Sequence, residues 1–329
     1  MSTKREAYLY LSAMLRARES AMLSREKAER LLDTPGFSDS AKLLVDCGYE
    51  DLSGADAAGI DAALSRRREE VFHEISRQSE AKPIVDLFRI KYDYHNAKAV
   101  LKAEAMALDP TPMLSESGRV DPETLLNAYR EERWRDLPER LAKGLREGKE
   151  ILARSENPQL SDFTLDRACF EELVRLSEET GNAFLRGYVA IQADSTNLKS
   201  AVRTLRMGKS ADFLRLALVP GGRVDAERFA AAGAEGLGAL FAGSRLADAA
   251  ARGVEAAQGG ALTGFERACD NAVTDYLRGA KLKAYGAEPV VAYLAALENE
   301  ITAVRMILTG KLAGIAPQTI RERLRDLYA

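Results

Sequence analysis

A polar motif occurs three times along the chain at an almost constant spacing. Each copy lies in a segment with helical periodicity and contains an asparagine, at Asn96, Asn197 or Asn299. The first two asparagines are 101 residues apart and the last two are 102 residues apart. A unit repeated at such a period buries its core partly against its neighbours. The spacing therefore predicts several similar subdomains.

Other segments repeat in step with this motif. Asp-Arg-Ala-Cys at 166–169 matches Glu-Arg-Ala-Cys at 266–269, and Gly-Arg-Val-Asp occurs at 118–121 and again at 222–225. Several matches in the same order indicate triplication. The predicted repeat units are 56–155, 156–258 and 259–329.

The two ends of the chain do not fit three complete copies. Residues 1–55 have no counterpart of their own, and the third unit is short after Gly310. One hypothesis accounts for both observations: the N-terminal helices complete the third unit and close the three units into a ring about a pseudo-threefold axis.

The composition favours helices. Aromatic residues make up 7% of the 329 residues, alanine and leucine are abundant, and no long alternating run of β-branched residues indicates a strand. We expect an all-α chain, with long helices at about 61–80, 84–107 and 183–207, a helix capped by Ser161 or Thr164, and a last helix at 317–328. We also expect helix breaks near Pro138 and Gly148.

Charge and sequence patterns exclude several classes of protein. The net charge of −3 argues against nucleic-acid binding. The polar residues at 1–6 do not resemble a signal segment, and the longest weakly charged run, 229–243, is too short to span a bilayer. Three widely spaced cysteines predict no disulfide framework. The charged run 66–70 is interpreted as a solvated helix face. We expect a soluble protein.

The repeated motif has two possible roles. Asp93 and Asn96 lie about 60° apart on a helix surface, whereas Lys98 and Lys102 lie on the other side. The pair could cap neighbouring helix ends, or the carboxylate could be a general acid or base. We favour the structural role, because catalytic groups must converge with a second group and a cavity. The third copy also departs from the pattern, with Ala296 in place of the aspartate and Ile301 in place of the lysine. The motif residues with a predicted structural role are Asp93, Asn96, Lys98, Lys102, Asp194, Asn197, Lys199, Arg203, Asn299 and Arg305.

Standard catalytic and ligand-binding patterns are absent from the sequence. There is no phosphate-binding loop, and His73 and His95 do not have metal-ligand spacing to the cysteines. Cys169 and Cys269 are interpreted as helix-packing residues. We therefore predict no catalytic residue, no cofactor and no metal site.

The motifs, taken together in their order along the chain, resemble the C subunits of bacterial and archaeal V-type and A-type ATPases, the counterparts of the eukaryotic d subunit. The resemblance covers nearly the whole chain. Besides the two Asp-x-x-Asn helices, it rests on the following residues: Tyr8, Tyr10, Arg16, Arg18, Tyr49, Glu300, Arg305, Gly310, Lys311, Ile320, Leu324 and Tyr328.

The resemblance implies a funnel of three similar helical subdomains. It implies a non-catalytic socket, one copy per complex, that joins the central-stalk rotor shaft to the proteolipid ring and transmits torque for proton or sodium transport. Such a protein is peripheral on the cytoplasmic face of the membrane, without membrane insertion. The loops 109–118 and 219–222 are candidate partner contacts. The alternatives are a helical scaffold or adaptor of another complex, and an α-helical enzyme.

Overall fold

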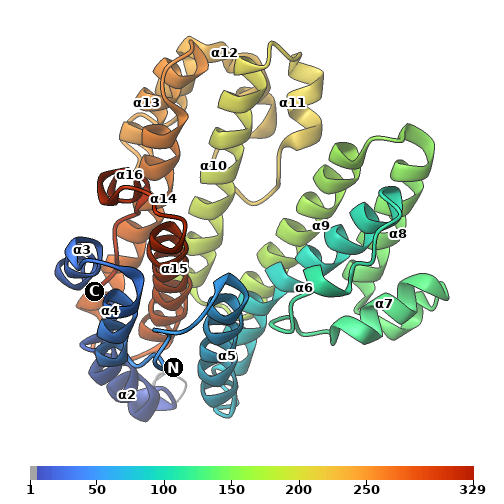
Figure 1. Ribbon diagram of the computed structural model, residues 1–329. Coiled ribbons are helices and arrows are strands. Elements are labelled where there is room, and N and C mark those ends of the chain that lie inside the picture. Colours follow the sequence, from blue (N-terminus) through green and yellow to red (C-terminus); the bar gives the residue numbers. More distant parts are fainter. Residues whose placement is uncertain (1–5) are drawn as a thin grey trace. The chain divides into compact units, whose positions relative to one another are not determined.

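The computed structural model describes residues 6–329 and consists of helices joined by loops (Figure 1). No strand occurs among the described residues, so the all-α prediction is confirmed. The polar residues 1–5 lie outside the described part. The chain forms two compact units: unit 1 comprises the chain up to Val85 together with Phe241–Ala329, and unit 2 comprises Asp86–Leu240. The threefold funnel and the four predicted segments remain predictions.

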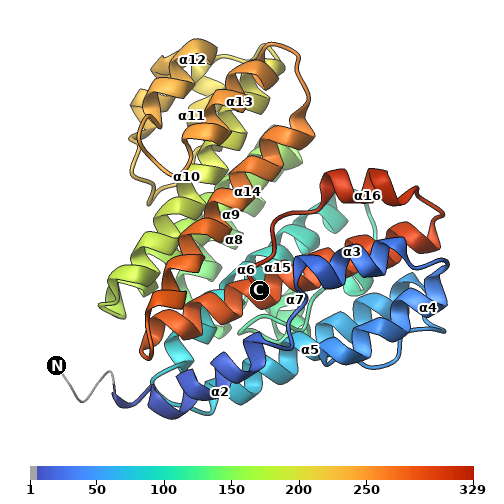
Figure 2. The ribbon, with the colours of Figure 1, turned by 90° about the vertical axis from the view of Figure 1, so that its left-hand side faces the viewer.

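Unit 1 is built around one long helix, α15 (Ala287–Leu312). Helices α2, α4, α5, α14 and α16 all contact it. Every residue from Pro289 to Leu297 is buried, as expected for a helix covered on all sides. Figure 2 shows α2, α3 and α4 beside α15 although they come from the opposite end of the sequence. The other elements of unit 1 are α2 (Leu9–Glu19), α3 (Arg25–Asp33), α4 (Phe37–Lys42), η1 (Leu43–Cys47), α5 (Ala57–Ser76), α13 (Ala247–Ala257), α14 (Leu262–Arg278), η4 (Gly279–Leu282) and α16 (Pro317–Arg323).

Unit 2 contains two further long helices, α6 (Lys82–Ala105, with its first residues in unit 1) and α10 (Ala183–Arg206). Helices α8 and α9 form an antiparallel hairpin, and α9 packs against α10 and α11. Helices α11 and α12 pack against α10 and against each other. The other elements are η2 (Thr111–Met113), α7 (Pro122–Arg130), η3 (Trp134–Asp136), α8 (Glu139–Ser155), α9 (Pro158–Glu179), α11 (Ala211–Ala217) and α12 (Ala226–Leu240).

Capping residues explain which helix boundaries were predictable. Helix α10 begins and ends within one residue of its prediction, because Asn182 accepts a hydrogen bond from Leu185 N at 2.8 Å and Gly208 follows in the left-handed region. The predicted start of α9 is wrong. Asn157 caps this helix, Pro158 is its first residue, and Ser161 lies buried one turn further on.

Gly148 does not break a helix, contrary to the prediction. It lies inside α8, at a point where a β-carbon would be 2.9 Å from Leu101 Cδ1 and 3.1 Å from Ser161 Oγ. The glycine therefore marks close approach between neighbouring helices of unit 2.

The charged run 66–70 on α5 is not wholly solvated, contrary to its interpretation. Arg68 is 4% exposed, and its Nε lies 3.0 Å from Glu298 Oε1 on α15. A buried charge requires a partner of opposite sign, and here that partner comes from a segment 230 residues away.

Buried Glu300 on α15 holds the N-terminal segment. It accepts hydrogen bonds from Leu23 N at 2.6 Å and Tyr49 Oη at 2.7 Å. Lys311, further along α15, donates to the carbonyl oxygens of Leu32 and Thr34 at 3.0 and 2.7 Å. These contacts join the two segments that the ring hypothesis requires to be adjacent, and completion of the third unit stays a prediction.

The Glu300 carboxyl predicts a specific pH dependence. Burial raises its pKa, although the hydrogen bonds from Leu23 and Tyr49 oppose this shift. The folded chain therefore holds the proton more tightly than the unfolded chain, whose glutamate pKa is about 4.3. The stability contribution of protonated Glu300 is present below that value and is lost as the pH rises through the folded pKa. Relative to wild type, Glu300→Gln should therefore gain stability as the pH is raised from about 5 to about 8.

Urea unfolding at the two pH values measures this gain. Glu150→Gln, at an exposed position on α8, is the matched control and should follow the wild-type profile. If the free energy of unfolding changed equally with pH in wild type and both variants, the raised pKa of Glu300 would be contradicted.

Candidate functional site: buried joints between long helices and loops

The repeated polar residues lie where a long helix contacts a later segment of the chain. On α6, Asp93 is fully buried. Its Oδ1 accepts hydrogen bonds from the backbone N–H groups of Arg119 and Val120 at 2.8 and 3.1 Å. Asn96 donates to Ser115 O at 2.8 Å and accepts from Ser115 N at 2.7 Å. The loop after α6 is thus attached to the helix at two points.

The same joint occurs on α10. Asp194 accepts hydrogen bonds from Arg223 N at 2.9 Å and Val224 N at 3.2 Å. Asn197 donates to Val219 O at 2.9 Å and accepts from Val219 N at 2.8 Å. Equivalent side chains therefore bind equivalent backbone groups in two copies of the repeat.

Glycine is required where the carboxylate meets the loop. A β-carbon on Gly118 would lie 2.4 Å from Asp93 Oδ1, and one on Gly222 would lie 2.3 Å from Asp194 Oδ1. This explains the repeated Gly-Arg-Val-Asp sequence. The glycine leaves room for the carboxylate, and the N–H groups of the arginine and the valine bind it.

The last residue of the tetrapeptide supplies the helix cap. Asp121 accepts from Thr124 N at 2.8 Å at the start of α7, and Asp225 accepts from Glu227 N at 2.9 Å at the start of α12. The idea that the motif aspartates cap these helices themselves is therefore wrong in detail. They bind the backbone just before each helix.

The third copy uses different residues for a related contact. Asn299 donates to Asp326 O at 2.7 Å, while Asn271 on α14 accepts from Asp326 N at 2.9 Å. Two asparagines thus bind the two backbone groups that one asparagine binds in the other copies. Ala296 replaces the motif aspartate, and the sequence contains no third Gly-Arg-Val-Asp segment. The carboxylate and the tetrapeptide are present together or absent together.

The joint on α6 continues into a buried charge network. Arg119 bridges Asp93 and Glu172, with its Nε 2.7 Å from Asp93 Oδ2 and its Nη1 2.8 Å from Glu172 Oε1. Tyr94 Oη also donates to Glu172, at 3.1 Å. Burial raises the pKa of Asp93, and Arg119 opposes this shift without cancelling it. Burial likewise raises the pKa of Asp194, against the N–H groups of Arg223 and Val224.

Hydrogen-bond donors of the protein itself bind these carboxylates. A general base must reach a substrate proton directly or through one water molecule. Asp93 instead faces two backbone N–H groups and a guanidinium. This arrangement supports loop attachment better than proton transfer.

The motif cations lie apart from the joints, on the other sides of their helices. Lys98 Nζ is 2.5 Å from Asp166 Oδ1, and Lys102 Nζ is 2.7 Å from Asp162 Oδ2, so both connect α6 to α9. Arg305 pairs with Asp61 on α5 at 2.6 Å. On α10, Lys199 is half-buried and Arg203 is exposed.

Several side chains with structural contacts of this kind were missed from the sequence. Arg167 donates to Arg215 O near the end of α11, and Arg267 donates to Glu322 O near the end of α16, each at 3.1 Å. The repeated Arg-Ala-Cys sequence indicates a shared role for these arginines, but the sequence analysis assigns a role only to the cysteines. Buried Glu172 carried no comparable signal, because its partners come from distant segments.

Other candidate residues do not form a reactive cluster. His95 is exposed, with its Nε2 3.0 Å from Met113 O. The three cysteines are buried and unpaired by disulfides, and burial raises the pKa of Cys169. Across residues 6–329, no group of three or more histidine, cysteine, aspartate or glutamate side chains could hold a metal ion. Within that same range, no helix combines the length and apolar character needed to cross a bilayer.

The fold and its joints define a helical-repeat protein whose regularly spaced polar residues fasten loops to long helices. Comparison with known sequences specifies the family. The family model "ATP synthase (C/AC39) subunit" matches residues 11–323, and the chain belongs to this family. The resemblance inferred from the sequence motifs is confirmed.

Individual relatives match over most of their length. The chain is 24% identical to the C subunit of the V-type sodium ATPase of Enterococcus hirae, covering 98% of this chain and 99% of that protein. It is 28% identical to the C subunit of the V-type ATP synthase of Thermus thermophilus over 68% of this chain and 70% of that protein. It is 27% identical to the C subunit of the A-type ATP synthase of Haloferax volcanii over 96% of both chains.

Substitution of either joint glycine should destabilise the fold. In Gly118→Ala and Gly222→Ala the new methyl group must displace a buried carboxylate, and such overpacking costs about 1–3 kcal/mol. Urea unfolding measures the loss. Gly54→Ala is the control, because no atom lies within 4 Å of a β-carbon there. Unchanged stability in both joint variants would show that the loops are not held as described.

Loss of the Asn197 amide should also weaken folding. Asn197→Leu leaves Val219 N and O buried without partners, at an expected cost of about 1–3 kcal/mol. Thermal and urea unfolding test this expectation, with Gln159→Leu at an exposed site as the control. Unchanged melting combined with loss of partner binding would identify the repeated polar motif as an interface instead.

Proposed function

We propose that this protein is a non-catalytic subunit of a rotary V-type or A-type ATPase or ATP synthase, and that it joins the rotor shaft to the proteolipid ring. The observation that carries this proposal is the match to the ATP synthase (C/AC39) subunit family over residues 11–323. In this role the protein transmits torque between ATP turnover and proton or sodium movement. One copy per complex lies on the cytoplasmic face of the membrane, without membrane insertion or a cofactor.

The joints support a mechanical role. A part that transmits torque must not let its loops swing freely on its helices. Asp93 and Asn96 fix the loop after α6 at Ser115, Arg119 and Val120. Buried polar side chains whose hydrogen bonds are satisfied, as those of Asp93 and Asn96 are, make a core rigid. We infer that Asp93, Asn96, Asp194 and Asn197 have this structural role.

The two loops predicted as partner contacts, 109–118 and 219–222, contain residues of the joints. Ser115 and Gly118 belong to the joint on α6, and Val219, in the joint on α10, is only 5% exposed. Those parts of 109–118 and 219–222 hold the fold and are poorly placed to contact a partner.

Exposed apolar side chains follow the long helices instead. They recur near the same end of each one: Met106, Leu108 and Met113 after α6, Met207 after α10, and Leu312 and Ile315 at and after the end of α15. Exposed apolar groups that recur in this way favour protein contact. We propose that they contact the shaft or the ring, through several weak interactions that act together.

Co-purification from the protein's own cells tests the proposed role. The tagged chain should bring down stalk and proteolipid-ring subunits. Recovery of a different, stable set of proteins without these subunits would support an adaptor of another complex and overturn the rotary assignment.

Substitution of the helix-end residues tests the proposed contact. Met106→Glu combined with Leu108→Glu should leave the isolated protein folded, because both side chains are exposed. It should lower the salt concentration at which the complex dissociates, because it places charge in an apolar contact. Val45→Glu, also at an exposed apolar site, is the control. If complexes containing the double variant keep full salt resistance, the contact lies elsewhere, and the N-terminal helices become the next candidate.

A further inference from the structure

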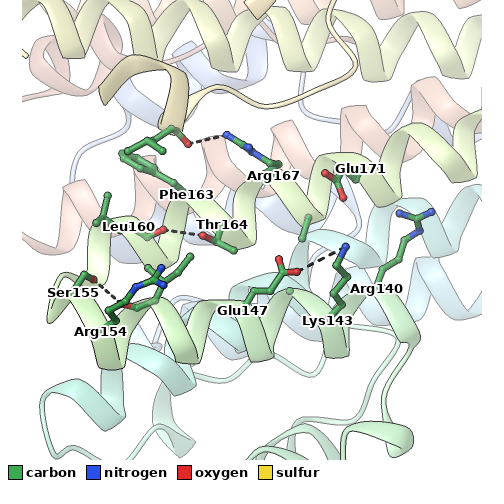
Figure 3. Close-up of a pocket in the computed structure, with 14 residues that line it drawn as sticks. Arg140, Lys143, Glu147, Arg154, Ser155, Leu160, Phe163, Thr164, Arg167 and Glu171 are labelled. Carbon is green, nitrogen blue, oxygen red and sulfur yellow. Dashed lines mark hydrogen bonds and ion pairs between the residues drawn. The ribbon is translucent and has the colours of Figure 1, made fainter. Parts of the chain in front are cut away.

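Helices α8 and α9 of unit 2 border an open groove of about 490 Å³ (Figure 3). Gly144 on α8 and Ala168 on α9 are among its lining residues, and a β-carbon on Gly144 would be 2.9 Å from Ala168 Cβ. These small side chains keep the groove floor low between the two helices. A long side chain or a third helix can therefore approach the hairpin closely.

The groove carries an excess of positive charge. Four cations line it against two acids, Glu147 and Glu171. The four cations are Arg140, Lys143, Arg154 and Arg167. Lys143 lies 3.8 Å from Glu147, and Arg167 donates to Arg215 O. Arg140 and Arg154 are exposed, and neither has an ion pair or a side-chain hydrogen bond to any residue of the described chain.

Part of the groove lining is apolar. It consists of Ile151, Leu160, Phe163 and Leu216, and Leu216 is 50% exposed. The surface thus combines an apolar wall with cations at its rim. This combination fits a partner with an apolar stripe flanked by carboxylates.

The repeat-related groove in unit 1 has a different charge balance. It lies between α13 and α14, encloses about 240 Å³, and places three arginines against three aspartates. The arginines are Arg245, Arg252 and Arg267, and the aspartates are Asp248, Asp275 and Asp326. Arg252 pairs with Asp248 at 2.9 Å, and Asp326 comes from the segment after α16. Here the chain itself supplies the carboxylates that the α8–α9 groove lacks.

We propose that the α8–α9 groove binds an acidic amphipathic helix of a partner protein. Arg140 and Arg154 are separated along α8 by about 21 Å, at 1.5 Å per residue. This distance is too great for one phosphate group and suits a partner helix of about 14 residues. Apolar residues at helical spacing on the partner would pack against Phe163 and Leu216, with flanking glutamates facing the two arginines. The inference rests on the groove alone and does not depend on the rotary function.

A designed peptide provides the test. The probe is a fluorescein-labelled helix of about 16 residues with leucines on one face and glutamates beside them, and its scrambled form is the peptide control. Fluorescence anisotropy with the full chain should show binding that weakens with salt, as expected for a charged rim. Arg140→Glu with Arg154→Glu should reduce the affinity about tenfold or more, because each reversal places like charge opposite the peptide.

Matched variants separate the groove from general charge effects. Arg146→Glu changes an exposed arginine of α8 outside the groove and should alter the affinity less than about twofold. Leu216→Ser should weaken binding without changing net charge, because it removes part of the apolar wall. Circular dichroism verifies that each variant is folded.

Three results would overturn the proposal. They are equal binding of the scrambled peptide, equal binding by the Arg140→Glu and Arg154→Glu double variant, and binding to phosphatidylserine vesicles in place of the peptide. Any of them, with stalk proteins still co-purifying, would refute the groove inference and leave the rotary assignment intact.

Discussion

The fold of both units depends on the requirement that buried polar groups find hydrogen-bond partners. A carboxylate such as Asp93 or Asp194, placed inside an apolar helix contact, must be supplied with donors, since an unsatisfied buried group costs about 1–3 kcal/mol. The donors are two consecutive backbone N–H groups of the following loop, and this choice fixes the path of that loop. The fixed path leaves no space for a side chain at Gly118 or Gly222. One energetic requirement therefore links a helix position to a tetrapeptide more than 20 residues later.

The third long helix shows what happens when one part of this arrangement is missing. Ala296 has no carboxylate, and no tetrapeptide is present to bind one. Next to Asn299, however, Glu300 accepts hydrogen bonds from Leu23 N and Tyr49 Oη. A buried acid is thus again satisfied by a segment distant in sequence, in this case the N-terminal one. The same physical rule connects a different part of the chain, and the repeat diverges without leaving the acid unpaired.

The sequence predicted those features that depend on local or periodic signals. The all-α class, the ends of α10 and the spacing of Asn96 and Asn197 follow from composition, capping residues and repetition. The start of α9 was misplaced despite the local Asn157–Pro158 cap, and the other failures concern contacts between distant segments. The burial of Arg68 depends on Glu298, the close packing at Gly148 within α8 involves Leu101, and the role of Glu172 depends on Arg119. A run of charges or a lone glycine has the same local appearance whether or not such a partner is present, so the sequence alone could not distinguish the two cases.

The two hairpin grooves extend this reasoning from the interior to the surface. In the α13–α14 groove, Asp248 pairs with Arg252 and Asp326 adds a further carboxylate, so the charges are balanced within the chain. In the α8–α9 groove, Arg140 and Arg154 are exposed without an ion pair to the described residues, and Leu216 leaves apolar surface uncovered. An exposed cation has little effect on the free energy of unfolding. Stability of the chain alone therefore does not explain why this repeat has more cations than acids beside an apolar wall. A partner that brings both carboxylates and apolar side chains accounts for the two features together, whereas a simple anion accounts only for the charge.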